Sequence, residues 1–282
     1  MRDYLALTKP RITWLIVMST AIGYYFGADK GWSVLTLLHT LLGTALLASG
    51  TAALNQWYER EADARMRRTQ LRPLPAGRLT PRSAFIFGVA ISLAGFIEMW
   101  LGANLLAALL GLFTLLSYLC VYTPLKQRSP HSTTIGAIPG AMPPLIGFAG
   151  AAGHLTPEAW VLFGILFLWQ FPHFYSIAWM YREDYERAGI RMLPVVEPDG
   201  LSTARQIVLY SLALIPLSLV PRWLGVQGNI YLAGATILGL LFLYSGVQIA
   251  RDRTRLRARR VLLASVAYLP LLYALMLVDR IA

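Results

Sequence analysis

Residues 34–55 read VLTLLHTLLGTALLASGTAALN, a continuous apolar stretch that contains no Asp, Glu, Lys or Arg. A helix needs about 20 such residues to cross the roughly 30 Å hydrocarbon core of a bilayer. A strand of a membrane barrel would be shorter and would alternate apolar with polar residues. The stretch therefore predicts a membrane-spanning helix and, with it, an all-α integral membrane protein.

Similar apolar stretches recur along the whole chain. Hydrophobic residues make up 56% of the sequence, charged residues 14%, and the mean hydropathy is +0.54. A soluble protein of this size carries about 25% charged residues. We predict a single polytopic membrane domain over residues 1–282, with nine spans near residues 12–26, 34–55, 84–101, 105–122, 134–151, 159–180, 207–224, 230–250 and 261–278. The fifth of these is rich in Gly and Pro, which predicts a kinked helix that packs closely against its neighbours.

The basic residues are distributed unevenly between the two sides of this arrangement. Of the 25 Lys and Arg, all but Lys30, Arg222 and Arg280 fall on the side of the N-terminus. Because Lys and Arg accumulate in cytoplasmic loops, we expect a cytoplasmic N-terminus and an external C-terminus. The same distribution explains the net charge of +11 without a nucleic-acid partner. The charged start runs directly into a span, without a signal peptide or presequence, which favours a bacterial or archaeal plasma membrane.

The single cysteine, Cys120, limits the chemistry that the protein can use. It excludes an internal disulfide framework, a cysteine-rich zinc site and an iron–sulfur cluster held by thiolates.

A row of oxygen-bearing side chains marks the cytoplasmic end of the second span. Asn55, Glu59 and Asp63 are spaced four residues apart, so on a continuing helix they share one face. Such a row suits Mg²⁺, which binds a few protein oxygens and completes its shell with water and phosphate. An arginine-rich stretch that could bind phosphate follows, with Arg67, Arg68 and Arg72. The alternative interpretation is a helix end with ordinary solvated charges.

A second acidic cluster follows the sixth span. Glu183, Asp184 and Glu186 alternate with arginines, and Gly189 and Pro194 predict a turn just after them. Two acidic helix ends that face each other could hold two Mg²⁺ ions on a pyrophosphate. That arrangement ionises an allylic carbon–oxygen bond, because the metal stabilises the leaving group as a Lewis acid.

Six ordered motifs relate the whole chain to a known family. They are LTKPR (7–11), RTQLRPLP (68–75), YTPLK (122–126), PPLIG (143–147), PHF (172–174) and DYERAG (184–189). With the acid row, they make the chain resemble the intramembrane prenyltransferases of the UbiA superfamily, and within it the branch that modifies haem. The resemblance implies a bundle of nine helices with an active site open to the cytoplasm.

The resemblance also implies a reaction. The farnesyl group of farnesyl diphosphate is transferred to a vinyl group of haem B, giving haem O with its hydroxyethylfarnesyl side chain, and diphosphate. Mg²⁺ is the expected cofactor and assists ionisation, whereas haem B is a substrate. Beyond the surrounding lipid, a haem A synthase or a terminal oxidase assembly is the expected protein partner.

The roles that the resemblance assigns fall on named residues. Asn55, Glu59, Asp63 and Asp184 would hold Mg²⁺ and orient the diphosphate, and Arg68, Arg72 and Lys126 would neutralise its charge. Glu59 stands where the superfamily commonly has Asp, and the second motif is not a pair of Asp residues four apart. The second metal site therefore stays open between Glu183, Asp184 and a tyrosine.

Of the four histidines, His173 is the candidate for binding the haem substrate. It follows Pro172 within the sixth span, and imidazole is the commonest axial ligand of haem iron. The alternative is a hydrogen-bonded histidine inside the bundle. His131 is a weaker candidate, and His39 and His154 lie toward the outer side.

Three other functions compete with this interpretation. A related prenyltransferase that acts on an aromatic quinone precursor would share the fold, the metals and the diphosphate chemistry. A transporter would place its charges near the membrane midplane and often shows inverted repeats, neither of which the sequence displays. A structural haem protein would need paired ligands on facing spans, and no convincing pair is present.

Overall fold

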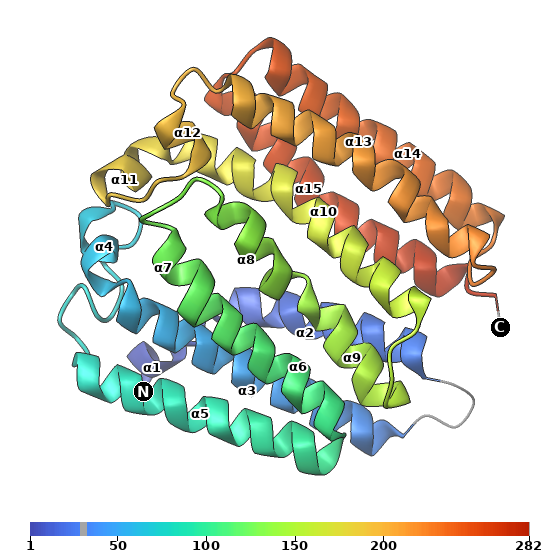
Figure 1. Ribbon diagram of the computed structural model, residues 1–282, viewed down its shortest axis with the longest axis horizontal. Coiled ribbons are helices and arrows are strands. Elements are labelled where there is room, and N and C mark those ends of the chain that lie inside the picture. The colour runs from blue at the N-terminus through green and yellow to red at the C-terminus, as the bar shows by residue number, and fades with distance from the viewer. Residues whose placement is uncertain (29–32, 282) are drawn as a thin grey trace. The chain divides into compact units, whose positions relative to one another are not determined.

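The computed structural model describes residues 1–28 and 33–281, and Figure 1 shows the course of the chain. The residues Lys30 and Ala282, to which predictions above refer, lie outside this part. The elements are α1 (Arg2–Leu7), α2 (Pro10–Gly27), α3 (Val34–Tyr58), α4 (Arg60–Arg65), α5 (Pro81–Gly102), α6 (Leu105–Leu116), the π-helical turn η1 (Ser117–Tyr122), α7 (Thr123–Leu125), α8 (Ser132–Gly140), α9 (Met142–Ala152), α10 (Pro157–Met180), α11 (Arg182–Arg187), α12 (Leu193–Val196), α13 (Leu201–Trp223), α14 (Asn229–Arg251) and α15 (Arg255–Val278). The predicted all-α membrane fold is confirmed.

Eight helical segments in the described part are long and apolar enough to cross a membrane. They are α3, α5, Leu105–Leu125, Ser132–Ala152, α10, α13, α14 and α15. The first predicted span, residues 12–26, coincides with α2, which is 18 residues long and is not among the eight. α2 contains Arg11 and several polar side chains, which lower the mean hydropathy of this helix. The ninth span therefore stays a prediction.

The contacts within the chain divide it into two compact units. The first consists of residues 1–163 and 184–190, and the second of residues 164–183 and 191–282. A single polytopic domain over residues 1–282 stays a prediction.

In the first unit, glycines allow α3 and α5 to pack backbone against backbone. A Cβ on Gly95 would lie 2.7 Å from the amide nitrogen of Leu47 and 2.8 Å from the carbonyl oxygen of Gly43, and one on Gly50 would collide with the side chain of Ser92. α2 and α9 pack in the same way, because a Cβ on Gly147 would collide with the backbone of α2. Small residues commonly mediate helix packing in membranes, where close approach maximises van der Waals contact.

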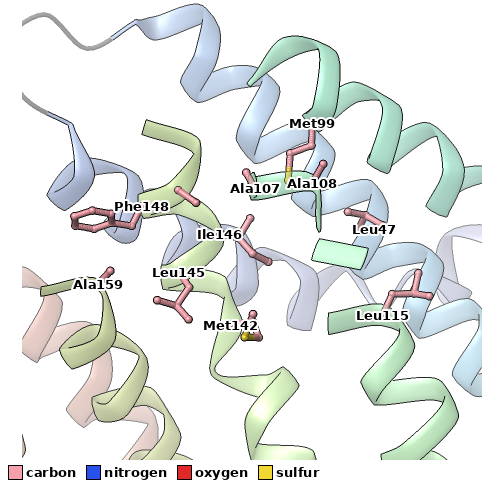
Figure 2. Close-up of a cluster of buried hydrophobic side chains, with 11 residues drawn as sticks. Leu47, Met99, Ala107, Ala108, Leu115, Met142, Leu145, Ile146, Phe148 and Ala159 are labelled. Atoms are coloured by element: carbon pink, nitrogen blue, oxygen red, sulfur yellow. The ribbon is translucent and has the colours of Figure 1, made fainter. Parts of the chain in front are cut away.

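The Gly- and Pro-rich span is broken and deeply buried, as predicted. Ala141 separates α8 from α9, and Pro143 stands in the first turn of α9, where its missing N–H leaves no hydrogen bond unmade. In the span Ser132–Ala152, 72% of the apolar 18-residue stretch is buried, which is the largest share among the eight spans. Figure 2 shows the core that α9 forms with α3, α5, α6 and the start of α10, including Leu145 and Ile146.

The second unit contains the rest of α10 and the helices α12 to α15. α13, α14 and α15 follow one another as neighbours in the contact pattern. Buried polar side chains link them: Ser218 and Tyr268 share a hydrogen bond of 2.8 Å, and the Tyr231 hydroxyl donates to the Ser218 carbonyl at 2.5 Å. α10 joins α15 through Trp169, whose Nε1 donates to the Ser265 carbonyl at 2.8 Å. These bonds link α13 to α14 and α15, and α10 to α15.

Candidate active site

The acid row lies on one nearly continuous helix, as its spacing predicts. α3 ends at Tyr58 and α4 begins at Arg60, but the helical hydrogen bonds pass through the junction. The amide of Glu59 donates to the carbonyl of Asn55 at 2.9 Å, and the amide of Asp63 donates to the carbonyl of Glu59 at 2.8 Å. The three side chains therefore keep the common face that the sequence predicts.

Asp63 is the most deeply buried acid of the row, with 1% of the residue exposed. Its Oδ2 accepts a hydrogen bond of 2.7 Å from the guanidinium of Arg72, so this arginine lies directly against the acid row. Thr69 closes the intervening loop, because its hydroxyl donates to the Asp63 carbonyl at 2.8 Å. The other oxygen, Oδ1, is buried and has no hydrogen-bond partner among the described residues. A buried carboxylate oxygen without a donor is costly, so this atom is suited to a cation that arrives with the substrate.

Glu59 and Lys126 form a buried ion pair, in which Nζ donates to Oε1 at 2.8 Å. Burial alone would raise the pKa of Glu59, but the ammonium groups of Lys126 and Lys9 hold it below its ordinary value. Burial would likewise lower the pKa of Lys126, but the Glu59 carboxylate holds it well above its ordinary value. Both groups are therefore charged at neutral pH.

Two tyrosines complete the surroundings of Lys126. Its Nζ lies 4.5 Å from the ring centroid of Tyr122 and 5.9 Å from that of Tyr118. Both rings belong to η1, and π-helical turns of this kind occur frequently at functional sites. No role was predicted for either tyrosine from the sequence, although Tyr122 begins the motif YTPLK.

Lys9 also contacts the acid row, although its place in the motif LTKPR predicted no binding role for it. Its Nζ donates to Oδ1 of Asn55 at 3.2 Å. Burial, assisted by the charges of Arg72 and Lys126, lowers the pKa of Lys9 to about 8. The backbone of Lys9 is left-handed, with φ 48° and ψ 61°. Among the described residues, it is the only non-glycine residue with a positive φ. The following Pro10 disfavours the ordinary helical conformation, so a helix break just before a proline was the available signal.

The second acidic cluster contributes one buried acid. Asp184 pairs with Arg187 and accepts a hydrogen bond of 3.4 Å from the amide of Arg67, so α11 contacts the arginine-rich loop that follows the acid row. Arg68 donates to the hydroxyl of Tyr185 at 3.3 Å and lies over its ring. Glu183, in contrast, is exposed.

The predicted metal ligands are thus arranged differently from a ready-made metal cage. Among the residues that the structure describes, no three His, Cys, Asp or Glu side chains are close enough to hold a metal ion together. The two acids have basic partners instead: Lys126 pairs with Glu59, and Arg72 with Asp63. Mg²⁺ typically uses only one or two carboxylates plus substrate phosphates, and the unpartnered Oδ1 of Asp63 fits that requirement.

His173 lies in the second unit, on α10. It stacks on Trp169, with 4.8 Å between ring centroids, and its Nδ1 is 2.8 Å from the hydroxyl of Ser265 on α15. That hydroxyl has one hydrogen, which it donates to the carbonyl of Leu262 at 2.6 Å. In the tautomer that agrees with both contacts, His173 donates from Nδ1 and keeps a lone pair on Nε2 that a metal can use.

The other histidines have ordinary contacts. His39 pairs with Glu98 at 2.7 Å near the hairpin that joins α5 to α6, and His154 lies within hydrogen-bond distance of the Ala152 carbonyl, at 2.9 Å. His131 is exposed.

Comparison with known proteins places this geometry in a family. The model of the UbiA prenyltransferase family matches residues 16–272, and the chain belongs to this family of membrane enzymes. A curated relative, the protoheme IX farnesyltransferase of Solibacter usitatus, is 67% identical over 99% of both chains. The protein of the same name from Koribacter versatilis is 49% identical over 99% of this chain and 94% of its own.

Solved structures agree on the fold. A structure described as digeranylgeranylglyceryl phosphate synthase has a TM-score of 0.82 at 19% identity, covering 99% of this chain and 97% of its own. A UbiA homologue from Archaeoglobus fulgidus, bound to GPP and Mg²⁺, has a TM-score of 0.66 at 16% identity, covering 97% of this chain and 99% of its own.

Proposed function

We infer that this protein transfers the farnesyl group of farnesyl diphosphate to a vinyl group of protohaem IX, which is haem B, and so forms haem O. The observation that carries this function is the 67% identity, over nearly the full length of both chains, to a protoheme IX farnesyltransferase. The site supports this function, because buried acids and basic side chains form ion pairs with one another near the end of α3. Such a group of charges is suited to a diphosphate and its metal ion.

The chemistry follows from the charges involved. The carbon–oxygen bond of the allylic diphosphate breaks, the vinyl carbon forms the new carbon–carbon bond, and water adds to the resulting cation with release of a proton. Lys126, Arg72 and Lys9 are positioned around the acid row and would stabilise the negative charge that develops on the leaving diphosphate. Such stabilisation is strong because the groups are held in place and partly shielded from water.

Asp63 would bind Mg²⁺ through its unpartnered oxygen, and the diphosphate would complete the shell of the ion. Asn55, Glu59 and Asp184 would orient the metal–diphosphate complex, each as a single further contact rather than as one preformed cage. When bound, the metal supplies Lewis-acid stabilisation of the leaving group. Arg68 would bind a diphosphate oxygen from the adjacent loop. The exposed Glu183 is a weaker ligand than Asp184.

His173 would bind the haem substrate through its iron. The contact with Ser265 agrees with a tautomer whose lone pair is on Nε2, and this nitrogen would face the iron. Bacterial relatives and the arginine distribution favour a plasma membrane protein with a cytoplasmic N-terminus, whose product passes to a haem A synthase or a terminal oxidase.

The test is a reaction of purified protein with haem B, farnesyl diphosphate and Mg²⁺, followed by mass analysis of the haem. The unaltered protein should add one farnesyl group and one water, and Asp63→Asn should reduce the rate at least about a hundredfold, as expected for lost electrostatic stabilisation of the transition state. Asp3→Asn is the matched control, because Asp3 also pairs with an arginine, Arg78, but on the surface. Unmodified haem with the unaltered protein, or full activity in Asp63→Asn, would contradict the proposal.

A further inference from the structure

An arginine-lined pocket lies in the second unit, where α10 ends and α15 begins. Its volume is about 440 Å³, and its lining consists of Met180, Tyr181, Arg255, Leu256 and Arg259. Arg255 and Arg259 are one helical turn apart, so they present two guanidinium groups to the same side of α15. The remaining lining is apolar or aromatic, which makes the pocket suited to an amphiphilic anion.

Neither Arg255 nor Arg259 is neutralised by an acidic side chain among the described residues. Arg257, which lies between them in sequence, pairs with Asp252 at 3.9 Å, whereas neither Arg255 nor Arg259 forms an ion pair within the described ranges. Arg255 instead lies over the ring of Tyr181, at 6.0 Å from its centroid. Like charges one turn apart repel each other, and an anion bound between them would remove that repulsion.

The pocket and His173 lie along the same two helices. Met180 is seven positions after His173 on α10, which corresponds to about 10 Å of helix. On α15, Ser265, the partner of His173, is six positions after Arg259, which corresponds to about 9 Å. These lengths match the reach from the iron of a haem, through a propionate chain, to the guanidinium of an arginine.

We propose that Arg255 and Arg259 bind the two propionate groups of the haem substrate while His173 faces its iron. The inference rests on the proposed function, because it takes haem B as the substrate. Arginine binds carboxylates through paired hydrogen bonds, and Leu256 and Met180 would pack against the porphyrin edge. The propionates lie on one edge of protohaem and the vinyl groups on the opposite one. The arginine pair therefore directs the vinyl edge away from the helix ends and into the membrane-spanning part of α10 and α15, which makes these arginines specificity-determining residues.

The test compares haem B with its dimethyl ester, in which both propionates are blocked, in titrations followed by the haem absorption band. The purified unaltered protein should bind the ester at least about tenfold more weakly, as expected for lost charge-assisted hydrogen bonds. The double variant Arg255→Gln/Arg259→Gln should bind haem B about as weakly as the ester and should no longer distinguish the two. The control, Arg251→Gln/Arg260→Gln, removes two arginines of the same connection that do not line the pocket and should behave like the unaltered protein.

The ester comparison on unaltered protein needs no variant, so it decides the question even if the double variant fails to fold. Equal binding of haem B and its ester would overturn the arginine pair as a propionate site, while farnesyl transfer to haem B would leave the proposed function standing. If the double variant instead lost binding only to vesicles of phosphatidylglycerol, the pocket would be a lipid site and the inference would be wrong. Absence of haem B binding to the unaltered protein would overturn both proposals.

Discussion

Replacing Lys126 by methionine is expected to destabilise the fold by about 3 kcal/mol, because it leaves a buried carboxylate without its main partner. The side chains of Glu59 and Lys126 are only 11% and 14% exposed, so water cannot replace the lost cation. Breaking a buried pair costs about 3–5 kcal/mol, and we take the lower end because Lys9 also acts on Glu59. Glu59→Gln should lower the free energy of unfolding by a similar amount, because it leaves the buried ammonium group of Lys126 without its carboxylate partner.

The double variant Glu59→Gln/Lys126→Met should be more stable than either single variant. A neutral pair leaves no buried charge, and replacing a buried ion pair by neutral groups is often close to neutral in stability. The coupling energy between the two sites is then expected to be at least about 2 kcal/mol. The same double variant should be inactive in farnesyl transfer, which would separate the structural role of the pair from its role with the diphosphate.

The assay is the free energy of unfolding in mixed detergent micelles, measured for the four proteins of the cycle. The matched control is the exposed pair of Arg60 and Glu61, whose side chains are 36% and 78% exposed and whose coupling should stay within about 1 kcal/mol. Additive effects of the two single substitutions would refute the interpretation of Glu59 and Lys126 as a buried, mutually dependent pair.

Three other outcomes are expected. Because the pKa of Glu59 is lower in the folded than in the unfolded state, its contribution to stability should be complete above the ordinary carboxyl range near 4 and should be lost as the pH falls through the lower folded pKa. The difference in unfolding free energy between the unaltered protein and Glu59→Gln should therefore shrink over that range. A constant difference would contradict the lowered pKa. Mg²⁺ with inorganic diphosphate should raise the melting temperature by more than the sum of their separate effects, because basic side chains already occupy the acids; a full shift with Mg²⁺ alone would count against this, and a chelator should reverse the effect. A reporter inserted after Arg72 should be cytoplasmic and one at the carboxyl end of the sequence external; an external reporter after Arg72 would contradict the predicted orientation.

The parts of the fold that depend on local sequence could be predicted. Apolar length identified the long helices, and the glycines and prolines of residues 134–151 identified the broken, buried span. The spacing of the acid row was sufficient to place Asn55, Glu59 and Asp63 on one face, because helix geometry alone fixes that relation.

The parts of the site that depend on distant segments could not be predicted in the same way. Lys9 is 46 positions from Asn55 and Lys126 is 67 from Glu59, and no periodicity connects such pairs. The sequence also gave no reason to separate Asp184, which is buried, from Glu183, which is exposed. Their difference arises from the contact of Asp184 with the loop at Arg67, a tertiary interaction.

The glycine contacts between α3 and α5 also bear on how the protein responds to membrane thickness. Gly43 and Gly50 on one helix and Gly95 on the other admit no extra methyl group, so the helices cannot slide past each other by a residue. α3 has 25 residues, about 37 Å of helix, and the acid row begins at its end. A bilayer a few ångströms thicker or thinner would ordinarily be accommodated by tilting or sliding of helices. Here the close glycine packing resists such sliding, so the acid row is expected to keep its position relative to α5 when the thickness of the bilayer changes.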